Sequence, residues 1–100
     1  MKAQLKRSGG VAGIPRRWEL DERALASKQA QEFKRLLERA GFFALPLQMG
    51  STGPARDAFC YELTVEDEGK RHTVKCAETA PPRPLWDCIE WILKTARRGA

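Results

Sequence analysis

Two alternating segments on either side of Glu68-Gly69 restrict the fold of this chain more than any other feature. If Glu68-Gly69 is a two-residue turn, the flanking segments form an antiparallel hairpin in a single register. On one face this register brings together apolar residues and the lone histidine: Val65 with His72, Leu63 with Val74, and Tyr61 with Cys76. On the other face it brings together opposite charges and two threonines: Glu66 with Arg71, Glu62 with Lys75, and Thr64 with Thr73. A slip by one residue would exchange the two faces, so we predict this register.

A second hairpin is predicted near the start of the chain, with strands at about 2–8 and 14–20. Pairing Leu5 with Trp18 and Ala3 with Leu20 gathers the apolar residues on one face. The same register sets four cations in two facing pairs: Arg7 with Arg16, and Lys6 with Arg17. Like charges directly opposite one another are unfavourable. Stability alone gives no reason for this cluster, which therefore suggests a binding partner.

Two further segments predict helices. Apolar residues recur at helical spacing over about 24–40, where Asp21 or Ser27 is a candidate cap and Gly41 ends the segment. A second apolar stripe covers about 84–97, behind a proline-rich connector. The order strand, strand, helix, strand, strand, helix predicts an α+β fold. We expect a four-stranded antiparallel sheet, made of two hairpins, with both helices packed on one face.

Four segments resemble emfourin, a small protein inhibitor of thermolysin-like metalloproteases. In chain order they are Ser8-Gly9-Gly10-Val11-Ala12-Gly13-Ile14, Ala40-Gly41-Phe42-Phe43-Ala44-Leu45-Pro46, Asp57-Ala58-Phe59-Cys60-Tyr61-Glu62-Leu63-Thr64-Val65, and Arg71-His72-Thr73-Val74. The resemblance runs from about residue 3 to residue 93. It implies tight, competitive binding to the active-site cleft of a thermolysin-like (protealysin-type) metalloprotease, with no cofactor and no catalytic residues in this chain.

The resemblance leaves open which loop enters the protease cleft. Thermolysin-like enzymes favour a large apolar residue beside the scissile bond, so an exposed apolar residue is expected. The first candidate is the glycine-rich loop with Val11, which has exposed backbone and consists of Gly9, Gly10, Val11, Ala12, Gly13 and Ile14. Leu25 is the second candidate, and Leu47 and Met49, in a loop predicted at 47–56, are the third. An electrostatic rim would be formed by Lys6, Arg7, Arg16 and Arg17. The alternative is that the glycine-rich segment is a plain turn, kept for its backbone angles.

Length and composition indicate one globular domain, residues 1–100, with 42% hydrophobic and 31% charged residues. No apolar run approaches the ~18 residues that a membrane span needs. The first residues lack the apolar core of a signal peptide, so we expect a cytoplasmic protein, monomeric when free. The three cysteines, Cys60, Cys76 and Cys88, are odd in number and widely spaced, which favours free, buried thiols in a reducing compartment.

Catalytic patterns are absent from the sequence. The lone His72 is predicted to face inward, and there is no zinc-ligand spacing or nucleophile motif, so neither a metal site nor an enzyme is expected. The net charge of +5 supports one alternative, a small basic nucleic-acid-binding module. RNA binders of this kind stack bases on exposed aromatic residues of a sheet. The predicted outward face has none, since it holds Lys6, Arg17, Glu62, Thr64, Thr73 and Lys75. We therefore expect a protease partner and no nucleic acid.

Overall fold

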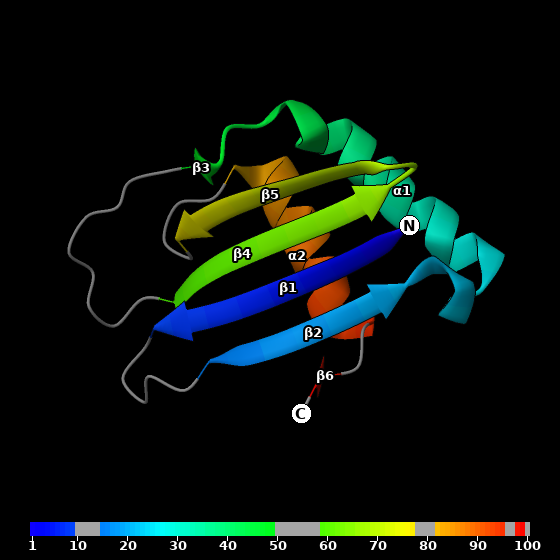
Figure 1. Cartoon of the computed structure of the whole chain (residues 1–100), viewed down its shortest axis with the longest axis horizontal. Coiled ribbons are helices and arrows are strands. Elements are labelled where there is room, and N and C mark those ends of the chain that lie inside the picture. Colours follow the sequence, from blue (N-terminus) through cyan, green and yellow to red (C-terminus); the bar gives the residue numbers. More distant parts are fainter. Residues whose placement is uncertain (10–14, 50–58, 78–81, 96–97, 100) are drawn as a thin grey trace.

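The computed structural model describes residues 1–9, 15–49, 59–77, 82–95 and 98–99. Four antiparallel strands form the body of the sheet: β1 (Lys2–Gly9), β2 (Arg16–Asp21), β4 (Phe59–Asp67) and β5 (Lys70–Ala77). Helices α1 (Ser27–Ala40) and α2 (Arg83–Thr95) both lie behind the sheet in Figure 1. The predicted α+β fold, with four antiparallel strands and two helices on one face, is confirmed.

Two strands that the sequence did not predict extend the sheet at its edges. The full strand order is β3-β5-β4-β1-β2-β6. The short strand β3 (Gln48–Met49) runs parallel to β5, and β6 (Arg98–Gly99) runs antiparallel to β2. The backbone N–H of Lys75 donates to the carbonyl of Leu47 at 2.6 Å, just before β3 begins. The expected loop at 47–56 therefore starts as an edge strand, because backbone N–H and C=O groups on the free edge of β5 need hydrogen-bond partners. Residues 50–56 lie outside the described residues.

Both predicted hairpin registers are confirmed. In the β4–β5 hairpin Leu63 pairs with Val74, and in the β1–β2 hairpin Leu5 pairs with Trp18. The β4–β5 turn is made by Glu68 at φ 51° and Gly69 at φ 80°, the two consecutive positive φ angles of a type I′ turn. The two hairpins join because β1 also pairs with β4, in antiparallel orientation, so that Leu5 lies opposite Leu63. The chain's first strand therefore becomes a central strand.

The core lies between the inner face of the sheet and the two helices. Leu5 and Leu63, adjacent on neighbouring strands, are both fully buried, and Phe33 of α1 stacks on Trp91 of α2 with ring centroids 4.9 Å apart. Every buried residue in the described parts of the chain is hydrophobic. These residues are Ala3, Leu5, Trp18, Leu20, Ala30, Phe33, Leu37, Phe42, Tyr61, Leu63, Val65, Val74, Cys76, Leu85, Cys88, Ile89 and Ile92. The opposite face of the sheet is polar.

The start of the first helix differs from the prediction. A short 3₁₀ turn, η1 (Glu22–Ala24), precedes α1, and Asp21 caps this turn by accepting a hydrogen bond from the N–H of Arg23 at 3.0 Å. Leu25 and Ala26 are extended, so α1 begins only at Ser27. Gly41 ends α1 in the left-handed conformation, at φ 60°, as the sequence predicted.

All three cysteines are free, as predicted, but one of them is not buried. Cys76 and Cys88 are buried, and burial raises the pKa of the Cys76 thiol to about 11 and that of Cys88 to about 12. Cys60 is exposed, because it belongs to the outward-facing set of residues in β4. The expectation of three buried thiols was wrong for Cys60.

Candidate functional site

The two ends of the β1–β2 hairpin hold the first two predicted binding segments. The pairing of Arg7 with Arg16 lies toward the glycine-rich loop, and the pairing of Lys2 with Asp21 lies toward Leu25. The loop residues Gly10, Val11, Ala12, Gly13 and Ile14 lie outside the described residues, and Gly9 ends β1 opposite Phe59. The strand end that leads to the glycine-rich loop and the turn that ends at Leu25 therefore lie at opposite ends of β1, which is eight residues long, or about 25 Å.

The four cations beside the glycine-rich loop do not share one surface. Lys6 and Arg17 lie on the outer face of the sheet, whereas Arg7 and Arg16 belong to the inner face, since neighbouring residues of a strand point to opposite sides. Arg7 is half-buried, and its guanidinium lies 5.3 Å from the ring centroid of Trp18, a cation–π contact. Of the four residues predicted to form a rim, Lys6, Arg16 and Arg17 are exposed.

Strand β4 also changes the charge balance that the hairpin alone suggested. Lys6 pairs with Arg17 on one side and with Glu62 on the other, and Glu62 in turn lies 4.0 Å from the ammonium of Lys75. The repulsion between Lys6 and Arg17 is therefore offset by a neighbouring carboxylate. This pairing weakens the argument that only a partner could explain the cations.

At the other end of the hairpin, local hydrogen bonds shape the turn from Asp21 to Leu25. Besides capping the N–H of Arg23, the carboxylate of Asp21 contacts the Arg23 guanidinium at 3.3 Å. The hydrogen bond from the Arg23 N–H, followed by the guanidinium, lowers the pKa of Asp21 below its ordinary value. The N–H of Leu25 donates to the carbonyl of Glu22 at 3.1 Å and closes the turn.

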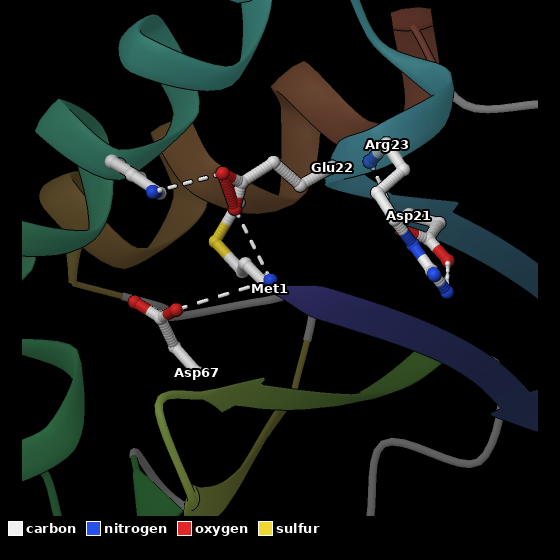
Figure 2. Close-up of polar contacts among 6 residues, drawn as sticks. Met1, Asp21, Glu22, Arg23 and Asp67 are labelled. Atoms are coloured by element: carbon white, nitrogen blue, oxygen red, sulfur yellow. Dashed lines mark hydrogen bonds and ion pairs between the residues drawn. The ribbon is translucent and has the colours of Figure 1, made fainter.

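The side chain of Glu22 connects this turn to the rest of the fold. One carboxylate oxygen accepts from the α-ammonium of Met1 and the other from the ammonium of Lys34 in α1, each at 3.1 Å. Figure 2 shows this carboxylate beside the Met1 ammonium, which Asp67 of β4 also approaches, at 3.9 Å. The Met1 ammonium and then Lys34 lower the pKa of Glu22, and Glu22 in turn raises the pKa of Lys34. Sequence reasoning missed this network, because no periodic spacing links the residues that form it.

The two residues that follow the 3₁₀ turn η1 have an extended backbone. Leu25 has φ −103° and ψ 151°, and Ala26 has φ −63° and ψ 148°, both in the extended region. Arg23, Ala24 and Ala26 are exposed, while Leu25 is half-buried and packs against the edge of the core. A hollow of about 280 Å³ opens beside Leu25. Its lining comes from β2, the turn and both helices: Glu19, Leu20, Asp21, Ala24, Leu25, Gln29 and Thr95.

The third predicted segment lies along the edge of β5. Leu47 is 58% exposed and is one of two large apolar residues on the described surface, the other being Phe43 at 40%. Met49 belongs to β3 rather than to a loop. Leu47 is therefore accessible, but it is followed at once by backbone that pairs with β5.

His72 has a structural environment, as predicted. Its Nε2 lies 2.6 Å from the carbonyl oxygen of Leu45, and its ring makes an edge contact with Phe42 at a centroid distance of 5.5 Å. Within the described residues, no group of three or more His, Cys, Asp or Glu side chains is arranged to hold a metal ion. No helix in the described parts of the chain is long and apolar enough to cross a membrane.

Comparison with protein families decides the relationship that the sequence motifs suggested. A family model described as emfourin matches residues 5–93, most of the chain. The chain belongs to the emfourin family. Parallel searches of curated proteins and of solved structures return no match. Membership in the emfourin family, which is a family of inhibitors, suggests a role as a protease inhibitor.

Proposed function

We propose that this emfourin-family chain is a competitive, tight-binding inhibitor of a thermolysin-like zinc metalloprotease and has no catalytic activity of its own. The observation that carries the proposal is the family match over residues 5–93. The three free thiols are consistent with action in a reducing compartment, so we include a cytoplasmic location in the proposal.

The turn ending at Leu25 is the segment that we propose to enter the protease cleft. Proteases bind their substrates as extended chains, and Leu25 and Ala26 are already extended, with Ala26 exposed. Leu25, which is half-buried against the edge of the core, supplies the large apolar residue that this class of enzyme favours. A turn held on both sides loses little conformational entropy when it binds, and it keeps its peptide bond away from the geometry of attack.

The glycine-rich loop is the competing proposal for the inhibitory segment. Its apolar residue is Val11, and the exposed cations Lys6, Arg16 and Arg17 flank the strand ends that lead to it. These cations would speed association with an acidic cleft, and salt would then slow it by screening. The strand end that leads to this loop and the turn ending at Leu25 lie at opposite ends of β1, so we treat the two segments as alternatives.

A direct inhibition assay tests the proposed function. We expect the protein to abolish the activity of thermolysin or of a protealysin-type enzyme at near-stoichiometric ratios. Unchanged activity of both enzymes at a several-fold excess of this protein would refute the proposal. A serine protease assayed in parallel is the control for non-specific interference.

A further inference from the structure

We infer that Glu22 is a positioning residue of the inhibitor: its carboxylate holds the turn that presents Leu25 in its binding geometry. This inference rests on the proposed function and on the choice of the Leu25 turn as the binding segment. It assigns a role to a residue that itself need not touch the protease.

Glu22 forms four hydrogen bonds, two through its backbone and two through its carboxylate. Its N–H donates to the carbonyl of Met1 at 2.9 Å, and its own carbonyl accepts from the N–H of Leu25 at 3.1 Å. Its two carboxylate oxygens accept separately from the Met1 ammonium and from Lys34. One residue therefore links the start of β1, the flank of α1 and the residue proposed to bind.

These contacts matter because they add polar links from the turn to β1 and α1 to the packing of Leu25 against the edge of the core. Arg23, Ala24 and Ala26 are exposed, and the hydrogen bonds of Asp21 to Arg23 are local, so they shape the turn without attaching it to α1. The ion pair with Lys34 joins residues twelve apart in the chain and fixes the turn against the helix. The side chains of Glu22 and Lys34 are 32% and 40% exposed, so solvent screens this pair in part.

A second ion pair of the same kind lies within one helix, away from the turn, and can serve as a control. Glu90 and Lys94 form an ion pair at 2.8 Å along α2, with side chains 38% and 73% exposed. This pair stabilises only its own helix, by the small amount typical of residues four apart. Glu90→Gln therefore removes a carboxylate charge and one ion pair without touching the turn, whereas Glu22→Gln removes a carboxylate charge and two ion pairs.

A double-mutant cycle separates positioning from general stabilisation. The variants are Glu22→Gln, Leu25→Ala, the two combined, and Glu90→Gln as control, each measured for its inhibition constant against the same protease. We expect Glu22→Gln to weaken inhibition about tenfold, which corresponds to about 1.4 kcal/mol. In the Leu25→Ala background the same change should weaken inhibition less than about twofold, because coupled residues are non-additive. Inhibition by the Glu90→Gln variant should match the parent.

Equal effects of Glu22→Gln with and without Leu25 would overturn the inference, since Glu22 would then act on inhibition without acting through Leu25. So would a Glu22→Gln variant that inhibits as well as the parent. Unfolding by urea, measured for every variant, confirms that all are folded under the assay conditions.

Amide hydrogen exchange provides a readout that needs no protease. The N–H of Leu25 should exchange about tenfold faster in Glu22→Gln than in the parent or in Glu90→Gln, because its acceptor is less firmly held. Unchanged exchange at Leu25 would overturn the positioning role. If the parent inhibits no thermolysin-like enzyme, the proposed function fails, and the exchange rates still decide whether Glu22 holds the turn.

Discussion

The two ends of the β1–β2 hairpin represent two ways of presenting a segment to a partner. One end leads into a sequence with three glycines within five residues, a composition that favours backbone freedom. The other end, the turn from Asp21 to Leu25, is held by a side-chain cap, a closing backbone hydrogen bond and the ion pairs of Glu22. The comparison shows that a surface turn without glycine can be preorganised by contacts with distant elements.

The charges at the two ends differ in the same way. Near the glycine-rich loop, the exposed cations Lys6, Arg16 and Arg17 exceed the nearby acid, Glu62. Near the Leu25 turn, acidic and basic groups are engaged with one another, as Glu22 is with Lys34. The first end favours long-range attraction of an acidic partner, whereas the second favours a fixed shape.

The largest expected effect discriminates between the two ends directly. If the Leu25 turn enters the cleft as proposed, Leu25→Asp should weaken inhibition about a hundredfold, because it places a charge where a large apolar group would bind. Val11→Asp introduces the same charge at the other end and should change inhibition less than threefold. Inhibition constants of the two folded variants provide the measurement, and the reverse ranking would assign binding to the glycine-rich loop.

Cys60 provides a chemical probe of the glycine end. It is exposed and pairs with Ser8, whereas Cys76 and Cys88 are buried and have raised pKa values of about 11 and 12. A maleimide should therefore modify one thiol rapidly in the native protein and all three after unfolding. A bulky label on Cys60 should leave inhibition unchanged if the Leu25 turn binds. A strong loss of inhibition on labelling, with the fold intact, would indicate binding near the glycine-rich loop.

The turn from Asp21 to Leu25 should loosen at low pH, because two carboxylates hold it. The carboxylates of Asp21 and Glu22 both have lowered pKa values in the folded protein. Their stabilising contribution is therefore complete above the pKa values of the unfolded chain and is lost as the pH falls through the lower, folded values. We expect exchange of the Arg23 and Leu25 amides to rise, relative to the rest of the protein, as the pH falls below about 4. Asp21→Asn should already show this increase for Arg23 at neutral pH.

The smallest expected effect concerns the β4–β5 turn, which depends on backbone conformation as the glycine end is expected to. Glu68 adopts a positive φ of 51°, which asparagine tolerates better than glutamate. Glu68→Asn should raise the free energy of unfolding by about 0.5–1 kcal/mol. Glu68→Gln is the matched control, because it removes the same charge without favouring positive φ. Equal stabilities of the two variants in urea unfolding would contradict this explanation.

Sequence reasoning predicted the strands and helices because their signals are local or depend on one register. Alternation around Glu68-Gly69 specified the β4–β5 hairpin, and the pairing of Leu5 with Trp18 followed from gathering apolar residues on one face. Gly41 marked the end of α1 because few other residues adopt its left-handed conformation. These predictions required no knowledge of how the hairpins meet.

Tertiary structure decided the features that depend on elements far apart in the chain. Pairing of β1 with β4 placed Glu62 beside Lys6, and the open edge of β5 drew residues after Leu47 into a strand. The backbone N–H of Glu22 donates to the carbonyl of Met1 next to the β1–β2 pairing, and α1 begins only at Ser27. Sequence alone identified Leu25 as a candidate, but only the packing of α1 against the turn brought Lys34 to Glu22. Such contacts leave no periodic pattern in the sequence, because their energy depends on distances that exist only after the chain has folded.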